Sequence, residues 1–334
     1  MKVVIAPDSF KGSASAGDLS LWIKEGWSSV RPGDEVICAP MADGGEGSRQ
    51  VIENSFAELS GIALIELAEI CGLTKYSKPD PLGAHTYELG LAIRKSIEGG
   101  AKKVILCVGG SASTDGGTGA LRALGARFLD ASGSEIPLGG AGLLQLASID
   151  FSNLIAAPKN GITIFSDVTN LLTGINGAAH VFAPQKGATP ADVELLDRAL
   201  FNLVQVSGFP EIAGSGAAGG TTYGFAMAYE AQVKSGSREI AQLIGLSELI
   251  ENADVVITGE GRYDSQSLSG KVISTVTELA HGKHLAYIVG EQKVQAPSGV
   301  KVLSLLDSVG SRDNAITNVR HWVTESARNL AKEI

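Results

Sequence analysis

The sequence lacks the features that mark secreted, membrane-spanning and cysteine-rich proteins. Only three of its 334 residues are cysteines, and none belongs to a Cys-x-x-Cys pair. We interpret Cys38 and Cys107, which lie in strand-like runs, as buried reduced thiols. No apolar run reaches the roughly 18 residues that a membrane span needs, and the opening MKVVIAPDSF has no signal-peptide pattern. We therefore expect a cytoplasmic protein without a membrane partner.

An excess of positive charge is also missing, because 36 acidic residues outnumber 27 basic ones and the formal net charge is −9. Nucleic acids and anionic membranes attract basic surfaces, so neither is an expected partner. A small anionic substrate stays open, since positive charge can be concentrated in one cleft. The length and a hydrophobic fraction of 44% suit a globular protein with room for two domains, and the sequence does not fix the oligomeric state.

Several catalytic motifs are absent or lack their context. There is no Gly-x-x-x-x-Gly-Lys-[Ser/Thr] motif, so the protein is not a standard P-loop NTPase. No Ser–His–Asp arrangement is recognisable, and His281 with His284 fits a helix end better than a metal site. Gly214–Gly219 matches the dinucleotide fingerprint, but the preceding Val206–Ala213 is a poor strand. We interpret this segment as a Gly-rich phosphate loop or as tight packing, and a nucleotide-dependent oxidoreductase stays a rival hypothesis.

Short apolar runs alternate with helical patterns, which predicts an α/β fold with a parallel sheet and crossover helices. The expected strands are Val3–Ala6, Glu35–Ala39, Val104–Val108, Ile162–Phe165, Val255–Thr258, Leu285–Val289 and Val302–Leu305. The expected helices are Gly17–Val30, His85–Glu98, Pro190–Val206, Tyr223–Lys234 and Arg312–Lys332. Thr189 is the expected cap ahead of Pro190. The Gly- and Ser-rich stretch Asp130–Leu146 is either a surface excursion or a domain hinge.

The early and late strands are alike, short and fully apolar, whereas the Gly-rich loops lie in the middle of the chain. This pattern favours a first domain built from both ends of the chain and a second domain inserted between them. We predict residues 1–60 and 250–334 for the first domain and residues 61–249 for the second.

Polar loops follow five of the expected strands directly. Their acidic residues include Asp8, Asp43, Asp115, Asp167 and Glu260. A single acid in such a place is commonly a helix cap or a turn residue, but five at the same relative position indicate a site. Open α/β sheets bind ligands outside the carboxyl ends of their strands, so we expect the five acids at one such edge.

The residue types in these loops suit the chemistry of Mg²⁺ and nucleotides. Mg²⁺ takes one or two carboxylates together with waters and phosphate oxygens, and Gly-rich loops at helix starts cradle phosphates with their N–H groups. Lys11, Lys186 and Lys271 stand beside glycine or in loops, and each is either a solvated surface charge or a partner of phosphate. The set fits phosphoryl transfer, which depends mostly on positioning and charge neutralisation.

Seven segments resemble the glycerate kinases of the bacterial glycerate and glyoxylate pathway, in the family's order. They are IAPDSFKGS (5–13), MADGGEG (41–47), VGGSASTDGG (108–117), SDVTNLLTG (166–174), FAPQKGA (182–188), GAAGG (216–220) and ITGEGRYD (257–264). The resemblance implies ATP-dependent phosphorylation of D-glycerate at the 2-hydroxyl, with the 3-hydroxyl or a related small hydroxy acid as alternatives. It also implies a flavodoxin-like domain, a smaller mixed α/β domain and an active-site cleft between them.

Roles for the matching residues follow as a hypothesis. The expected catalytic residues are Asp8, Lys11, Asp43, Asp167, Glu260 and Arg262, and the expected Mg²⁺ ligands are Asp43, Asp167 and Glu260. The expected ATP-binding residues are Gly109, Gly110, Ser111, Ser113, Asp115, Gly116, Lys186, Gly216, Gly219, Gly220 and Lys271. Arg262 or Lys11 would hold the glycerate carboxylate. Asp167 is the first choice for the general base, because Thr169 and Asn170 beside it could orient its neighbours.

The sequence departs from the family's pattern at two places. The family carries a few dozen more residues before the segment Leu64–Leu73, where this chain has only Ser48–Ile62. Either a peripheral excursion is lost or a stretch of the sequence is omitted. A Gly-Thr-Gly-type turn of the family appears here as Tyr87–Gly90 and keeps only its last glycine, which leaves substrate preference open. A catalytically silent sensor of glycerate or a sugar acid is a further rival, which the retained acids and lysines disfavour.

Overall fold

The structure is a computed structural model that describes residues 1–55, 59–268 and 270–334. These residues form two compact units, each with its own hydrophobic core. Unit 1 contains Met1–Asp43, Gln50–Ala57 and Ser235–Ile334, and unit 2 contains Gly44–Arg49 and Glu58–Lys234. Unit 1 includes residues 235–249, which the predicted domain limits assign to the inserted part. The domain boundaries predicted from the sequence remain a prediction.

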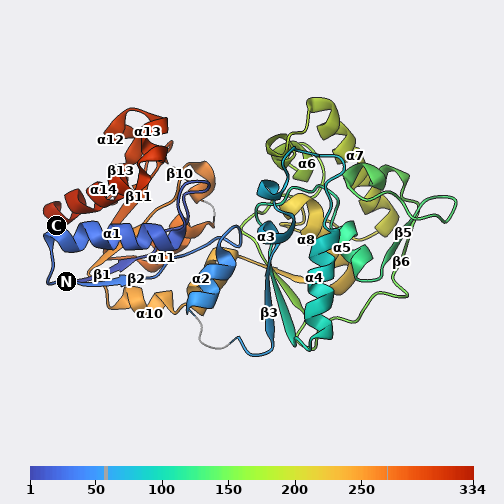
Figure 1. The fold of residues 1–334 in the computed structure, drawn as a ribbon, viewed down its shortest axis with the longest axis horizontal. Coiled ribbons are helices and arrows are strands. Elements are labelled where there is room, and N and C mark those ends of the chain that lie inside the picture. Colours follow the sequence, from blue (N-terminus) through green and yellow to red (C-terminus); the bar gives the residue numbers. More distant parts are fainter. Residues whose placement is uncertain (56–58, 269) are drawn as a thin grey trace. The chain divides into compact units, whose positions relative to one another are not determined.

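Unit 1 is built on five parallel strands in the order β13-β11-β9-β1-β2 (Figure 1). The strands are β1 (Lys2–Ile5), β2 (Glu35–Cys38), β9 (Val255–Thr258), β11 (His284–Val289) and β13 (Lys301–Ser304). Along the chain of this unit the strands therefore lie in the order 2-1-3-4-5, and the winding direction reverses between β1 and β9. These two strands pair in parallel, with Val3 beside Val255 and Ile5 beside Ile257.

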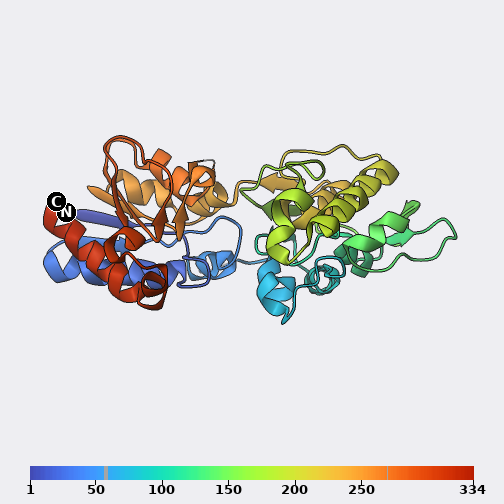
Figure 2. The same cartoon turned by 90° about the horizontal axis from the view of Figure 1, so that it is seen from above.

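Helices cover both faces of this sheet (Figure 2). On one face α1 (Ala16–Val30) packs against α14 (Val319–Glu333), and glycine is required at Gly26 because a Cβ atom there would collide with the carbonyl oxygen of Thr324. The other face carries α9 (Gly236–Leu243), α10 (Leu246–Glu251) and α11 (Val272–Leu279). Two short helices, α12 (Leu305–Val309) and α13 (Arg312–Thr317), join β13 to α14. The short parallel pair β10 (Arg262–Tyr263) and β12 (Glu291–Gln292) completes the unit.

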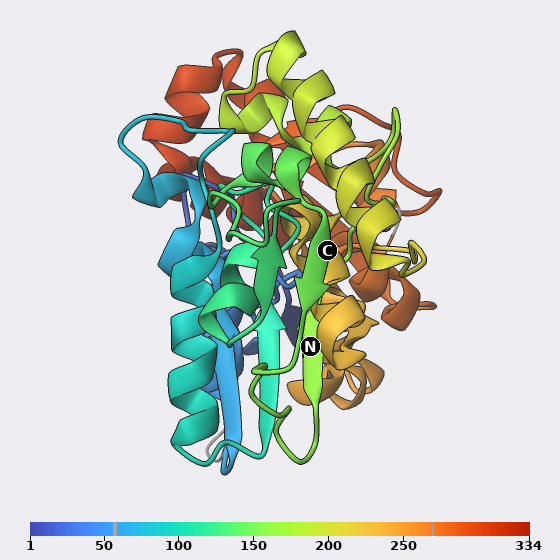
Figure 3. The same ribbon diagram turned by 90° about the vertical axis from the view of Figure 1, so that its right-hand side faces the viewer.

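Unit 2 has a second parallel sheet, in the order β3-β4-β7-β8. Its strands are β3 (Ile62–Glu66), β4 (Lys103–Cys107), β7 (Ile162–Phe165) and β8 (Gln232–Lys234). Figure 3 shows β3 and β4 side by side, with α4 (Tyr87–Glu98) running along them. The other helices of this unit are α3 (Leu67–Cys71), α5 (Thr118–Ala123), α6 (Ala178–Phe182), α7 (Pro190–Ser207) and α8 (Thr221–Tyr229). α2 (Ser48–Ser55) contains residues of both units.

The stretch Asp130–Leu146 is an excursion within unit 2 rather than a domain hinge, and Ile136, Leu143 and Leu146 in it are buried in the core of that unit. It lies between β5 (Arg127–Leu129) and β6 (Ser148–Asp150), which pair antiparallel and close the excursion at its base. Both flanks therefore belong to the same compact unit. Within the described ranges, no helix combines the length and apolar character that crossing a bilayer requires.

The predicted α/β class with parallel sheets is confirmed. All seven predicted strands occur within one residue of their expected bounds. Thr189 caps α7 as expected: its hydroxyl accepts the N–H of Asp192, whose carboxylate accepts the N–H of Thr189. Pro190 lies in the first turn of α7. Its missing N–H costs no hydrogen bond there, because the first N–H groups of a helix have no acceptor within the helix.

Two predicted helices are wrong in extent. The helix expected over Tyr223–Lys234 is α8 and ends at Tyr229. Glu230 adopts a left-handed conformation with φ of 52°, which cannot continue a right-handed helix, and the chain then enters β8. The helix expected over Arg312–Lys332 is interrupted at Asn318, which separates α13 from α14.

Candidate functional site

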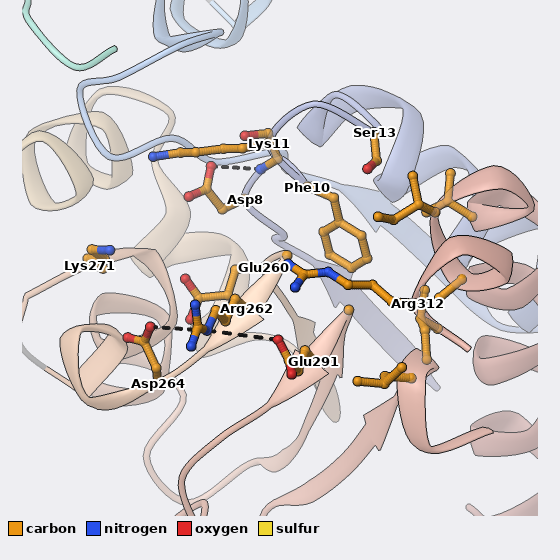
Figure 4. A pocket seen from close by; sticks show the side chains of 18 of the residues that line it. Asp8, Phe10, Lys11, Ser13, Glu260, Arg262, Asp264, Lys271, Glu291 and Arg312 are labelled. Carbon is orange, nitrogen blue, oxygen red and sulfur yellow. Dashed lines mark hydrogen bonds and ion pairs between the residues drawn. The ribbon is translucent and has the colours of Figure 1, made fainter. Parts of the chain in front are cut away.

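A cavity of about 280 Å³ opens in unit 1 at the carboxyl ends of β1 and β9 (Figure 4). Its walls come from the loops that follow β1, β2, β9 and β11, from Lys271 before α11, and from α12, α13 and the start of α14. The loop after β9 begins with Gly259, where a Cβ atom would collide with the carbonyl oxygen of Ile288 on β11. Glycine therefore lets this loop turn beside the neighbouring strand. Doubly wound sheets bind ligands at this point of winding reversal.

Glu260 is a buried acid of this cavity, at the end of β9. Its side chain is 8% exposed, and its Oε1 atom has no hydrogen-bond partner among the described residues. The pKa of Glu260 is raised to about 7, chiefly by burial and to a smaller extent by the charges of Asp264 and Asp43, whereas the Ser267 hydroxyl and Lys271 oppose the shift. A buried carboxyl of this kind is able to take up and release a proton near neutral pH.

Asp8 is the second buried acid, at the end of β1. It is 5% exposed, and burial raises its pKa well above the usual value, with a further contribution from the charge of Asp43. Lys11 and the N–H of Ser9, which donates to Asp8 Oδ1 at 2.7 Å, act in the opposite direction. Two carboxyls of raised pKa thus stand at the ends of neighbouring strands.

Basic side chains accompany these acids. Lys11 Nζ lies 3.4 Å from Asp43 Oδ2, and Asp43 raises the pKa of this lysine. Arg262 Nε lies 3.7 Å from the carboxylate of Asp264, and Lys271 also lines the cavity. Figure 4 shows the Arg312 side chain reaching into the same space from α13. The cavity therefore offers several cations to an anionic ligand.

The opposite end of the cavity is apolar, and sequence reasoning missed it together with Arg312. Six side chains form this apolar wall: Phe10, Leu305, Leu306, Ala315, Ile316 and Val319. Apart from Phe10 they lie on α12, α13 and the start of α14, where apolar residues have the same pattern whether they face a core or a ligand. The one signal in the sequence was an arginine at the start of the closing helix.

The structure divides the predicted site residues between the two units. Those that line the cavity of unit 1 are Asp8, Lys11, Asp43, Glu260, Arg262 and Lys271. Those in unit 2 are Asp167, Gly109, Gly110, Ser111, Ser113, Asp115, Gly116, Lys186, Gly216, Gly219 and Gly220. The expectation of one common sheet edge is therefore wrong, since β1, β2 and β9 belong to one sheet and β4 and β7 to another.

In unit 2 the two Gly-rich loops pack against each other. The N–H of Gly116 donates to the carbonyl oxygen of Gly219 at 3.0 Å, and a Cβ atom at Gly219 would collide with the carbonyl oxygen of Ser113. The segment 214–219 follows the end of α7, and residues 208–216 form no strand. The segment packs tightly against the loop 108–117, and the strand that a dinucleotide fingerprint needs does not precede it. Phosphate binding by this segment stays a prediction.

Asp115 and Lys186 are both buried within this packing. The Asp115 carboxylate accepts the N–H and the hydroxyl of Thr86 at 2.9 and 2.8 Å and the N–H of Gly117 at 3.1 Å. Lys186 is 3% exposed, and burial lowers its pKa to about 8, against the influence of Asp115 and Cys71. Both side chains hold the loop 108–117 in place in this conformation.

The first-choice base, Asp167, follows β7 in unit 2 and is half-buried. The Asn170 amide beside it donates to the carbonyl oxygen of Asn176 at 2.7 Å, so it is engaged within its own loop. Among residues 1–55, 59–268 and 270–334, no group of three His, Cys, Asp or Glu side chains is placed to hold a metal ion. Mg²⁺ needs only one or two carboxylates, however, and Asp43 and Glu260 line one cavity.

A doubly wound sheet with perturbed carboxyls and cations at its switch point is typical of an α/β enzyme that acts on a small anionic ligand. A sequence model of the glycerate kinase family matches residues 3–59 and 49–334. The chain therefore belongs to the glycerate kinase family, as its seven segments indicated, and it is a kinase.

Relatives of known name match almost the whole chain. The chain is 35% identical to a glycerate 2-kinase of Escherichia coli K12, with 99% of this chain and 97% of that protein covered. It is 35% identical to a glycerate kinase of Bacillus subtilis, with 100% and 98% covered. A crystal structure described as a glycerate kinase 2 from Salmonella typhimurium LT2 superposes with a TM-score of 0.79 at 34% identity and covers 100% of this chain.

The comparisons also bear on the short segment Ser48–Ile62. The alignment with the E. coli protein spans 370 positions, although this chain has 334 residues, so that relative has residues without a counterpart here. The family match is divided into two stretches that meet at residues 49–59. The break thus falls in the segment where the sequence departs from the family's pattern. Residues 56–58 lie outside the described residues.

Proposed function

We propose that the protein transfers the γ-phosphoryl group of ATP to the 2-hydroxyl of D-glycerate, giving 2-phosphoglycerate and ADP. The observation that carries the proposal is the cavity of unit 1, in which Glu260 and Asp8 have raised pKa values beside Lys11, Arg262 and Arg312. The name of the E. coli relative supports glycerate as the acceptor and its 2-hydroxyl as the position.

Glu260 is the general base in this proposal, in place of Asp167. Its Oε1 atom is buried without a partner among the described residues, and a pKa of about 7 matches the pH at which a base works best. The carboxylate accepts the proton of the glycerate hydroxyl while the hydroxyl oxygen bonds to the γ-phosphorus. The bond from that phosphorus to the bridging oxygen breaks, and ADP leaves.

The other residues of the cavity neutralise and orient charge. Arg262 or Lys11 holds the glycerate carboxylate, because a guanidinium or ammonium group pairs well with a carboxylate. Asp43 is the Mg²⁺ ligand favoured by its position in the same cavity as the base, and Asp8 orients the lysine through its charge. When bound, Mg²⁺ neutralises charge on the phosphate oxygens. The predicted phosphate contacts of Gly109, Gly110 and the loop that follows stay part of the proposal.

The proposal extends to the setting of the enzyme. Cys38, Cys71 and Cys107, all within the described residues, are thiols rather than disulfides. Burial raises the pKa of Cys71 to about 12, which keeps it protonated and unreactive. Three unbridged cysteines support a reducing, cytoplasmic environment.

The test is to incubate the purified protein with Mg-ATP and D-glycerate, to measure ADP by a coupled assay and to locate the new phosphate by NMR. We expect 2-phosphoglycerate. A product phosphorylated at the 3-hydroxyl would replace the proposed position and keep the kinase reaction. If neither D-glycerate nor any related small hydroxy acid yields ADP above the ATP-only control, the proposal is wrong.

A further inference from the structure

The cavity of unit 1 has two chemically different ends. Its polar end holds the acids together with Lys11 and Lys271, and its other end is the apolar wall formed by Phe10, Leu305, Leu306, Ala315, Ile316 and Val319. Figure 4 shows Phe10 and Arg312 facing the space between the two ends. Glycerate carries a carboxylate and two hydroxyls on three carbons. It therefore has almost no apolar surface to place against such a wall.

The apolar wall is partly open to solvent. Phe10, Leu305 and Val319 are nearly buried, whereas Ile316 is 48% exposed and Leu306 is half-buried. An apolar surface that lines a cavity gains free energy when a flat apolar group covers it and releases water. Phe10 is only 5% exposed and belongs to the core of unit 1, so Ile316 and Leu306 provide most of the open apolar surface. The wall thus favours a ligand with a planar, weakly polar part.

Arg312 links this wall to the polar end. It is exposed on α13, and Lys293 and, more weakly, Arg312 lower the pKa of Glu291, which also lines the cavity. An arginine guanidinium presents several donors in a planar fork that matches phosphate oxygens. A ligand that lies along the cavity would meet first an apolar surface, then a guanidinium group, and then the lysines and acids.

We propose that the apolar wall of unit 1 binds the base of a purine nucleotide, with Arg312 contacting its phosphates. This inference rests on the proposed function, because it places the nucleotide of that reaction. The base lies against Ile316 and Leu306, and the phosphates extend toward Lys271 and Glu260. The position agrees with the rule that doubly wound sheets bind nucleotides at the switch point of the strands.

The packing in unit 2 gives independent support for this position of the base. The fingerprint segment 214–219 is held against the loop 108–117 by the hydrogen bond between Gly116 and Gly219. Ser113, Asp115 and Thr221 are fully buried there, so no planar ring can lie against these three side chains without displacing the packing. The wall of unit 1, by contrast, shares a cavity with the predicted site residues Glu260 and Lys271.

The test measures binding of Mg-ADP without glycerate, by isothermal titration calorimetry, so that turnover plays no part. Ile316→Asp places a charge on the wall, and Ile316→Ser removes the apolar side chain without adding one. The matched control is Leu21→Asp, an equally drastic change at a residue that is 59% exposed on α1 of the same unit. We expect the Kd of ADP to rise at least tenfold in Ile316→Asp and at least threefold in Ile316→Ser, and to stay within twofold in the control.

Arg312→Gln tests the phosphate contact separately. We expect it to weaken ADP about tenfold and AMP less, because AMP has one phosphate fewer for the guanidinium to hold. An ADP affinity within twofold of wild type in both Ile316 variants would overturn the inference. So would a loss of D-glycerate binding in those variants while ADP binds normally, because the wall would then serve the acceptor.

The measurements distinguish a failure of the proposed reaction from a failure of this inference. A wild-type protein that binds ADP through Ile316 but phosphorylates no hydroxy acid would refute the proposed reaction and support the inference. A wild-type protein that phosphorylates glycerate, and whose ADP affinity is indifferent to Ile316, would do the reverse. A wild-type protein that binds neither ADP nor GDP would overturn the inference outright.

Discussion

The ammonium group of Lys186 lies 2.6 Å from the carbonyl oxygen of Ser113, in the interior of unit 2. The same group donates to the hydroxyl of Ser111 at 3.0 Å. A buried ammonium is costly unless its donors are used, and here two of three are bonded to the loop 108–117. Lys186 therefore holds this loop in position through these two hydrogen bonds, and this role does not depend on contact with a phosphate.

The first prediction concerns the stability of the fold as a function of pH. Burial lowers the pKa of Lys186 to about 8 from 10.5. Between these values the unfolded chain binds a proton that the folded chain has released, so this residue makes the free energy of unfolding rise with pH. We expect the wild-type stability, relative to that of Lys186→Met, to increase by about 1–3 kcal/mol between pH 7.5 and pH 10.

Urea unfolding of both proteins at the two pH values measures this difference. The matched control is Lys75→Met, at an exposed lysine of the same unit, which should show no such dependence. If the unfolding free energies of wild type and Lys186→Met change by the same amount across this pH range, Lys186 is not desolvated in solution.

The second prediction concerns the general base. Glu260→Gln keeps the shape of the side chain but cannot accept the proton, so we expect kcat to fall by about 10²–10⁴ at saturating substrates. Because the ionised carboxylate is the active form, wild-type kcat should rise with pH and level off above a pKa of about 7. The control Glu248→Gln, at an exposed acid on α10, should leave kcat within twofold. A loss smaller than tenfold in Glu260→Gln would remove Glu260 from this role.

The third prediction separates the two candidate bases. Asp167 was the first choice from the sequence, but Asn170 beside it is hydrogen-bonded within its own loop. We expect Asp167→Asn to lower kcat by less than tenfold at saturating glycerate and ATP. A hundredfold loss in Asp167→Asn together with a small effect of Glu260→Gln would exchange their roles. Steady-state kinetics of the two variants side by side decides between them.

The stability of Glu260 variants offers a check that does not depend on activity. The folded protein holds the Glu260 proton up to a pH of about 7, whereas an unfolded chain releases it near 4.5. Stability from this group is therefore present at low pH and is lost as the pH rises through 7. Glu260→Gln should be more stable than wild type by about 1–3 kcal/mol at pH 8, and the advantage should shrink toward pH 5. Equal stability at both pH values would mean that the carboxyl is hydrated.

The sequence predicted the sheets well because strands and their following loops carry local signals. Five of the buried strands are short apolar runs that lead into a polar loop with an acid, so their bounds and their polar edge are readable. The order of strands in a sheet depends on pairing between distant parts of the chain, and this order determines which acids lie in the same cavity. Val255–Thr258 pairs with β1 across some 250 residues of chain, whereas Val104–Val108 joins another sheet. The five similar loops are therefore divided between the units. Those after β1, β2 and β9 line the cavity of unit 1, and those after β4 and β7 belong to unit 2.

The remaining parts of the site could not be predicted, because their signals are ambiguous at the level of residue type. An apolar residue such as Ile316 has the same pattern whether it covers a core or a cavity. A glycine such as Gly219 serves equally for a phosphate loop or for close contact between two backbones, and only the position of Ser113 distinguishes them. Arg312 needed the bend between α12 and α13 to reach the cavity.

The last prediction tests whether the geometry of the cavity depends on the glycine that precedes Glu260. A methyl group at Gly259 would collide with the carbonyl oxygen of Ile288, so Gly259→Ala must push β9 and β11 apart. We expect the variant to lose about 1–3 kcal/mol of unfolding free energy, as overpacking of a tight interior does. Glu260 would shift with its backbone, so kcat should fall even at temperatures where the protein stays folded.

Gly33→Ala is the matched control for this change. Its added methyl group would meet nothing within 4 Å, and its backbone is not in the left-handed region, so its stability should stay within about 0.5 kcal/mol of wild type. Urea unfolding gives the stability of both variants, and single-temperature kinetics gives their kcat. If Gly259→Ala matched Gly33→Ala in both measurements, β11 would have room for the methyl group. The tight turn after β9 would then not be what holds Glu260 at the end of the strand.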